Sequence, residues 1–477
     1  MGMKPAGWGG VIQIRHGDAI TGEPTVACMP GGCGRTNWDR YMSLKKNLSI
    51  SQGVVLAICT IVGSGLLGLP GLAIETSGGK VAALAWPITT VISIPLVLVF
   101  LKLSLDVQDS GGIARYASLA LGEWAGTAAT FILALTFMLC IPIGTYMGST
   151  YIQKILGLPT SQIFTISLFV LSVSTLLNYF GVRPSAWINK ASALSMVLLV
   201  ILFVVAKPGL LADGLTAYQT YVWDWQDVSV SSIWGACAIL FWAFLGWENL
   251  SFGSEEVKGG SFAIKLIFLI GFIAVTLIYA ALALVAAGAD AEGLNIAGVS
   301  GMLGILDGSP LAPFADVLIV LIVIANVNAW VFAASRMMYA AGRERILPSF
   351  LGTLSKSSIP QASLIFMLAV YLLLSAAIHF QFIPLSKGLM IANQNFIFIY
   401  IAVIICYVKS NRSAASLTIA ALSAASTAFI VSGFGWMLAI PLTLTLVGYG
   451  IHRLRNRQAD HRKWDAALVK SKAETGS

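Results

Sequence analysis

The stretch IVGSGLLGLPG, residues 61–71, lies inside a strongly apolar run near the start of the chain. It contains three closely spaced glycines, Gly63, Gly65 and Gly68, followed by Pro70. In a helix interior a glycine costs up to about 1 kcal/mol relative to alanine, and a proline costs about 3 kcal/mol. The sequence therefore predicts that this apolar helix is interrupted in its middle.

The composition of the whole chain indicates a membrane protein. Of its 477 residues, 57% are hydrophobic and only 10% are charged, whereas soluble domains carry about 25% charged residues. A bilayer core about 30 Å thick requires roughly 20 apolar residues per helix. Windows of this size predict an all-α polytopic membrane protein with twelve spans, at approximately 53–74, 81–104, 125–150, 162–180, 187–206, 233–252, 266–287, 313–335, 361–378, 389–408, 414–431 and 434–451.

The distribution of charge predicts the orientation of these spans. The net charge is +8, and if the N-terminus is cytoplasmic, most basic residues fall in inner loops or in the C-terminal tail. The outer loops hold only four lysines, Lys80, Lys154, Lys207 and Lys387. This pattern follows the positive-inside rule and predicts that both termini are cytoplasmic. The basic tail is expected to meet anionic lipid head groups rather than nucleic acid.

The N-terminal extension, residues 1–47, is glycine-rich up to residue 41 and shows no helical periodicity. Either Met42 is the true initiator, because a short basic head and the first span follow it, or the extension is a disordered cytoplasmic tail. Cys28 and Cys33 within it lack the two further ligands of a structural zinc site. We therefore expect no metal and no cofactor.

The first ten spans are interpreted as two sets of five, residues 48–206 and 207–408, followed by two additional helices at 409–452 and a basic tail at 453–477. Because five is odd, the two sets would be inverted relative to each other. Inverted repeats with broken helices that face each other are a common transporter plan. Span six should therefore also be interrupted, and it contains Gly246 with Glu248 just after it.

Two broken helices suggest a binding site. An unwound segment within a bilayer is tolerated only where its backbone groups line a cavity or bind a ligand. The N-terminus of a half-helix suits a carboxylate, and unwound carbonyl groups suit an ammonium group, so together they could hold both ends of an α-amino acid. The alternative is that Gly63, Gly65 and Gly68 only permit close packing of helices.

Three stretches carry a resemblance to a known family. They are the glycine-rich stretch at 61–71, FWAFLGWENLSFGSEEVKGG at 241–260, and ASRMMYAAGRERILPSFLGTLSKSSIPQASL at 334–364. In content, order and spacing the chain resembles the amino acid–polyamine–organocation (APC) family of transporters over about residues 48–452, and within it the bacterial exporters of methionine and branched-chain amino acids. EEVKGG lacks the Asn-Pro that usually follows the lysine in the family.

The resemblance implies a LeuT-type fold, with a 5+5 inverted repeat and two C-terminal helices, and a coupled carrier that works by alternating access. It also implies that backbone groups of the first break meet the substrate, and that an aromatic side chain at Trp242 closes over it. The candidate substrate-binding residues are Val62, Gly63, Ser64, Gly65, Phe241, Trp242, Phe244 and Asn326.

Glu248 is the only acidic residue placed well inside a span. A charge at membrane depth costs at least about 2.5 kcal/mol on insertion scales, and such residues often mark ion pathways. Glu248 is therefore the ion-coupling candidate, and the alternative is that it only holds backbone or a neighbouring helix by hydrogen bonds. Met196 falls where some proton-coupled relatives carry a lysine, which leaves proton and sodium coupling both open.

Four asparagines lie within apolar spans, Asn326 and Asn328 in span eight and Asn393 and Asn395 in span ten. Burying an amide without a partner costs a few kcal/mol, so each is expected either to bridge helices or to line a cavity.

The expected function is secondary transport of an amino acid across the cytoplasmic (inner) membrane of a bacterium. Apart from Glu248, no span has an extra charge that could neutralise a charged substrate, so neutral, apolar amino acids are favoured, with import or export open. The sequence has no H-E-x-x-H and no phosphate-binding loop, which argues against an enzyme or an ATP-driven pump. The alternative function is an amino acid sensor of the same fold that does not transport.

Overall fold

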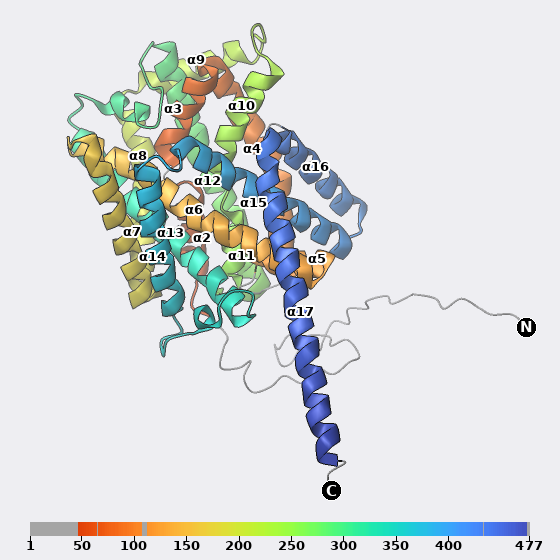
Figure 1. Cartoon of the computed structure of the whole chain (residues 1–477). Helices are drawn as coiled ribbons and strands as arrows, with labels where there is room; N and C mark the ends of the chain where they lie inside the picture. Colours follow the sequence, from red (N-terminus) through yellow and green to blue (C-terminus); the bar gives the residue numbers. More distant parts are fainter. Residues whose placement is uncertain (1–45, 64, 107–111, 433, 475–477) are drawn as a thin grey trace, which may run out of the picture. The chain divides into compact units, whose positions relative to one another are not determined.

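The computed structural model describes residues 46–63, 65–106, 112–432 and 434–474 (Figure 1). Ser64, Met42, Cys28 and Cys33 lie outside the described residues, so the predictions that concern them stay predictions. Within the described part, the chain is helical, and its only β-type pairing is an isolated parallel bridge between Leu48 and Val257.

All twelve predicted spans are confirmed as helices long and apolar enough to cross a membrane. In chain order they are α2 and α3 together (Ile50–Ile61 and Gly65–Ser77), α4 (Gly79–Asp106), α6 (Glu123–Ile155), α7 (Ile163–Phe180), α8 (Val182–Ala206), α10 and α11 together (Val230–Leu240 and Trp247–Phe252), α12 (Gly260–Ala291), α13 (Ala312–Arg343), α14 (Gln361–His379), α15 (Leu385–Ser410), α16 (Ala414–Val431) and α17 (Ala439–Glu474).

Two helices between the spans were not predicted. α5 (Gly112–Leu121) precedes span three, and α9 (Gly209–Tyr221) precedes span six. α9 packs closely on α12 because glycines remove side chains from the contact. A Cβ on Gly214 would lie 2.0 Å from the carbonyl oxygen of Leu284, and one on Gly288 would lie 2.0 Å from that of Leu210. Both helices are too short to span a bilayer, so windows of span length do not detect them.

Burial divides the spans into a centre and a periphery. The broken first span, α6 and α13 are mostly buried, whereas α16 and α17 are mostly exposed. α13 contacts α6, α7 and α8, and α12 contacts α2 and α4. α17 continues without interruption to Glu474. It therefore passes residue 453, where the predicted basic tail begins. The candidate site therefore forms among the buried central helices.

A contact that we call the N-terminal latch joins the segment before α2 to the loop after α11 and to α13. The backbone N–H groups of Asn47 and Leu48 donate to the carbonyl oxygen of Glu256 at 2.9 and 2.8 Å, and the N–H of Lys258 donates to that of Leu48 at 2.8 Å. The Glu256 carboxylate forms a buried ion pair with Arg336 at 2.9 Å. Both broken spans are thereby connected at this end to span eight.

Candidate functional site

The first span breaks between α2 and α3. α2 ends at Ile61, and α3 begins at Gly65. Between them Gly63 has a φ of +32°, in the left-handed region that favours glycine. The predicted interruption is confirmed, but it involves only part of the glycine cluster, because Gly68 and Pro70 lie inside α3.

Close packing, the second interpretation of the glycines, applies to Gly68 and also to Gly71, which follows the cluster. A Cβ on Gly68 would lie 2.6 Å from the hydroxyl of Tyr151, and one on Gly71 would lie 2.2 Å from the carbonyl oxygen of Gly298. A side chain at either position would therefore displace its neighbour. The sequence stretch combines a helix break with a tightly packed helix face.

Side chains of other spans stabilise the end of α2. The Nδ2 of Asn326 donates to the carbonyl oxygen of Cys59 at 2.6 Å, and the Nε1 of Trp330 donates to that of Thr60 at 2.8 Å. The hydroxyl of Tyr279 donates to the carbonyl oxygen of Val62 at 3.0 Å. The last carbonyl groups of a helix have no partner within it, so α12 and α13 supply the donors that this buried end requires.

Span six breaks as predicted. α10 ends at Leu240, a short 3-10 turn follows at 241–244, and α11 begins at Trp247. Gly246 has a φ of +120°, which a side chain would strain. A Cβ there would also lie 3.0 Å from Cγ1 of Ile61. The two breaks therefore lie against each other in the centre of the described helices.

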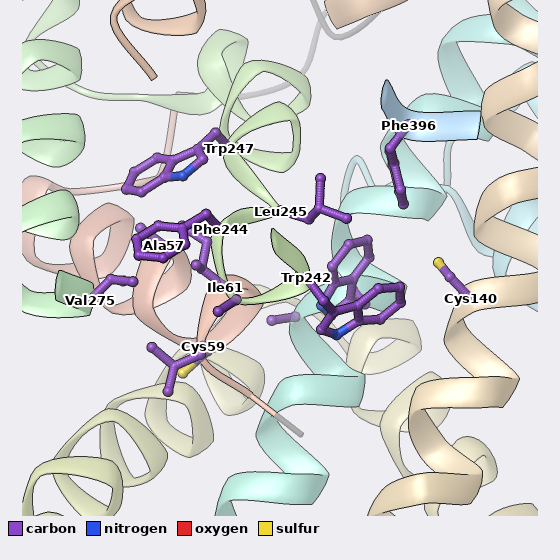
Figure 2. Packing of buried hydrophobic residues seen from close by; sticks show 14 of the residues in the cluster. Ala57, Cys59, Ile61, Cys140, Trp242, Phe244, Leu245, Trp247, Val275 and Phe396 are labelled. Atoms are coloured by element: carbon purple, nitrogen blue, oxygen red, sulfur yellow. The ribbon is translucent and has the colours of Figure 1, made fainter. Parts of the chain in front are cut away.

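A cavity of about 20 Å³ lies beside the two breaks, with room for about one water molecule. It is lined by Thr60, Ile61, Val62, Gly65, Cys140, Ile141, Gly144, Thr145, Trp242, Asn326, Val327 and Trp330. These residues come from spans one, three, six and eight, and no charged side chain is among them. Figure 2 shows Cys140 projecting from α6 toward the side where Trp242 lies.

The structure brings four of the predicted site residues together on this cavity: Val62, Gly65, Trp242 and Asn326. Asn326 therefore both bridges to α2 and lines the cavity. Gly63 lies against Asn326, since a Cβ on it would be 1.7 Å from the amide nitrogen of that side chain. The substrate-binding role of these residues stays a prediction.

Three of the predicted residues that the structure describes, Gly63, Phe241 and Phe244, are not among the lining residues. Phe241 is buried, with 2% of its surface exposed. Phe244 packs on α12, with ring centroids 6.4 Å from Phe272 and 6.1 Å from Tyr279, and Figure 2 shows it on the side away from Trp242. In this arrangement the Phe244 ring packs on α12 and supports the turn of span six.

None of the predicted site residues lies on span three, although this span contributes to the cavity. Cys140, Ile141, Gly144 and Thr145 of α6 form one wall of the cavity, and Trp330 of α13 forms part of another. Trp330 follows Asn326 by four residues, so the two share one helix face. That spacing could have identified Trp330, whereas the small and apolar residues of span three carry no chemical signal.

Glu248 lies in the first turn of α11, is fully buried, and is not among the cavity-lining residues. Its Oε2 accepts hydrogen bonds from the hydroxyl of Tyr400 at 2.7 Å and from the backbone N–H of Gly246 at 3.1 Å. Its Oε1 has no hydrogen-bond partner within the described residues. The carboxyl group thus holds the break of span six and retains one oxygen for a further ligand.

The other asparagines differ from one another. Asn328 bridges three spans, because it accepts from Nδ2 of Asn178 at 2.7 Å and donates to Oδ1 of Asn189 at 2.9 Å. Both side-chain polar atoms of Asn395, and Oδ1 of Asn393, are buried and find no hydrogen-bond partner in the described residues. The prediction of a bridge is thus met by Asn328, and span ten retains unsatisfied polar atoms.

Comparison with known proteins places this geometry in context. The family model for amino acid permeases matches residues 48–471. The uncharacterized amino acid permease YecA of Bacillus subtilis is 27% identical over 85% of this chain and 95% of its own length. The L-methionine/branched-chain amino acid exporter YjeH of Escherichia coli is 22% identical over 75% of this chain and 84% of its own. The branched-chain amino acid permease BcaP of Bacillus subtilis is 22% identical over 87% of this chain and 94% of its own length.

Proposed function

The chain belongs to the amino acid permease family of the APC transporters, and from this we propose that it carries neutral, apolar amino acids by alternating access. The family and its relatives are transporters rather than enzymes. The twelve spans and the family are consistent with the LeuT-type fold. The finer proposals concern the substrate class, the direction and the coupling ion.

The observation that carries the substrate class is the uncharged lining of the cavity beside the two breaks. A charged substrate side chain desolvated there would have no opposite charge, and an unpaired buried charge is strongly unfavourable. Ile141, Val327 and Trp330 supply apolar surface instead. The start of α3 at Gly65 adds a helix N-terminus, which favours a carboxylate. An amino acid with an apolar side chain fits this combination.

The small volume of the cavity supports a gating role for Trp242. With room for about one water molecule, the cavity cannot contain an amino acid until its walls move. Trp242 is 9% exposed and lies on the turn between α10 and α11. Its ring is the largest group in the lining that is attached to a broken helix. We infer that rotation of this turn opens and closes the site.

Proton coupling through Glu248 is the second part of the proposal. A carboxyl group with one oxygen hydrogen-bonded by Tyr400 and the other without a partner in the described residues can take up and release a proton. It lies two residues after Gly246, so movement of the break would change its exposure to water. Sodium is the alternative coupling ion. The cytoplasmic location of both termini, and of the basic residues near them, belongs to the same proposal.

Reconstitution into proteoliposomes tests the proposal. The full chain is screened for counterflow of each of the twenty amino acids, and then for net movement driven by an imposed pH or sodium gradient. We expect exchange of methionine, leucine, isoleucine and valine, and net movement with the pH gradient. Export is the direction to examine first, because YjeH is named as an exporter. Binding of these amino acids without exchange would indicate the sensor instead.

A further inference from the structure

A second cavity has a lining that shares no residue with the candidate site, and it has a different character. It measures about 160 Å³, and it is formed by α6, α15 and α17 with the end of α5. The residues that line it are Leu121, Trp124, Ala125, Ala128, Ala129, Ile132, Phe398, Ile399, Ile401, Ala402, Ile405 and Thr445. We call it the α6–α15–α17 groove. Eleven of these twelve residues are apolar or aromatic, so the groove suits a hydrocarbon.

The groove opens onto the surface that faces the bilayer. Ile401 and Leu121 in its lining are 40% and 37% exposed. α17, which borders it, is among the most exposed spans, and Leu446 next to Thr445 is 71% exposed. Figure 1 shows α17 as the long dark-blue helix running past α15. An apolar surface of this kind on a membrane span contacts acyl chains rather than water.

The inner wall of the groove is closed by tight packing between α17 and α6. A Cβ on Gly448 would lie 2.4 Å from the Cα of Ala128. The small residues Ala125, Ala128 and Ala129 leave the space, because their side chains do not reach across it. A rigid apolar cavity of about 150 Å³ accepts a benzene-sized molecule. The groove is therefore large enough for a segment of one hydrocarbon chain.

Cationic side chains lie at one end of the groove and are linked to its lining. The Nζ of Lys409, one turn after Ile405, donates to the carbonyl oxygen of Ala120, next to Leu121. On α17, Arg453 donates from Nε to the hydroxyl of Tyr449 at 2.8 Å. The Tyr449 ring contacts Trp124 edge-on, with centroids 5.8 Å apart. Both cations remain exposed. This end carries positive charge at the level where the spans leave the membrane.

We propose that the α6–α15–α17 groove binds one acyl chain of an anionic phospholipid, whose phosphate group lies against Lys409 and Arg453. The apolar lining selects the chain, and the two cations select the charge of the head group. Trp124 and Tyr449 lie between these two regions, in the position that aromatic rings favour at a membrane interface. The bound lipid would fill a gap between span three, which lines the candidate substrate cavity, and spans ten and twelve.

Native mass spectrometry of the purified full chain in detergent tests the proposal. The protein is titrated with phosphatidylglycerol and, separately, with phosphatidylcholine of identical acyl chains. We expect phosphatidylglycerol to bind the more tightly. Lys409→Gln and Arg453→Gln should each weaken its binding about fivefold, as expected for one cation near an anionic lipid. Lys265→Gln, which removes an exposed lysine on α12, is the matched control and should leave binding unchanged.

A filling variant tests the groove itself. Ala402→Phe projects a ring into the groove and should abolish the tightly bound lipid, whereas Ala424→Phe, on an exposed position of α16, should not. Thermal melting of each variant checks that it is folded. Equal binding of the two lipids, or equal binding by Ala402→Phe and Ala424→Phe, would overturn the proposal. A lipid-free dimer that Ala402→Phe converts to monomers would assign the groove to a second copy of the chain instead.

Discussion

The hydroxyl of Tyr400 on α15 donates a 2.7 Å hydrogen bond to Oε2 of Glu248 on α11. Both residues are buried, and the same oxygen also accepts from the N–H of Gly246 at 3.1 Å. The pair joins the break of span six to span ten. A change in the charge of the carboxyl group would therefore alter a contact between two helices, which is the kind of link that ion coupling requires.

Glu248→Gln should retain amino acid exchange and lose net transport driven by a pH gradient. Glutamine preserves the shape of the side chain and most of its hydrogen bonds but does not titrate. Counterflow and pH-driven net flux are measured on the same proteoliposomes. If the variant still moves substrate against its gradient with unchanged pH dependence, Glu248 has a structural role and coupling lies elsewhere.

Tyr400→Phe should reduce pH-driven net flux severalfold while counterflow persists, because the ring remains and only the hydrogen bond to Glu248 is removed. Tyr371→Phe is the matched control. Tyr371 is also fully buried, and its hydroxyl has no hydrogen-bond partner in the described residues. Equal net flux in the two variants would separate Tyr400 from the coupling step.

Trp242→Ala should raise the apparent KM for substrate or uncouple exchange, because the lining would lose the ring attached to the turn of span six. Trp242→Phe should retain more function, since an apolar ring remains. Initial rates of exchange over a range of substrate concentrations give KM and the maximal rate for both variants. Wild-type kinetics in both would remove Trp242 from the site.

Gly65→Leu should abolish substrate binding and leave membrane insertion intact. A Cβ at Gly65 already lies 2.8 Å from Cδ1 of Leu69 and 3.4 Å from Cδ1 of Trp242, so a longer side chain would enter the cavity. Gly450→Leu on α17 is the control, because a Cβ there meets nothing within 4 Å. Binding is measured by substrate-dependent thermal stabilisation. If Gly65→Leu binds substrate with unchanged affinity, this glycine only permits close packing of helices.

Glu256→Ala should lower the free energy of unfolding by about 3–5 kcal/mol, because it leaves Arg336 buried without its carboxylate. Among the described residues, the guanidinium of Arg336 would then retain the hydroxyl of Ser335 at 3.0 Å and the ring of Phe332, whose centroid lies 3.7 Å from the Arg336 Cζ atom. The double variant Glu256→Met/Arg336→Met should recover most of the loss, since apolar pairs often replace buried ion pairs without cost. Denaturation in detergent compares the three proteins, and a double variant as unstable as the single one would contradict this account.

The ion pair between Lys80 and Asp224 should make the stability of the fold depend slightly on pH. The hydrogen bond from Lys80 lowers the pKa of Asp224 below its ordinary value of 3.8. Because the pKa of Asp224 is lower in the folded state, the ion pair stabilises the fold at pH values above 3.8. This stabilisation is lost as the pH falls below 3.8. The difference in Tm between wild type and Asp224→Asn should therefore be present at pH 7 and diminish below pH 3.8. Asp213→Asn on α9 serves as the control, and a difference that persists in acid would exclude the pair as its cause.

The helix breaks were predictable because their signals are local. Gly63 and Gly246 adopt φ values that favour glycine, and the requirement for an inverted second break follows from counting spans. The wall formed by Cys140 and Gly144 was not predictable, because small residues on a buried face look the same whether they line a cavity or pack on a helix. Phe244 is a candidate site residue from the family resemblance, whereas in the structure the 3-10 turn at 241–244 places its ring against Tyr279 of α12.

The N-terminal latch is made largely of main-chain atoms, so it depends on chain length more than on residue type. Most substitutions at Asn47 or Leu48 would keep the N–H groups that donate to Glu256, and only proline removes one. Because α2 begins at Ile50, an insertion between the latch and the helix would shift the first break along its span. Related chains are therefore expected to vary at the exposed Asn47, to keep an apolar residue at the buried Leu48, and to inherit the spacing of this segment unchanged.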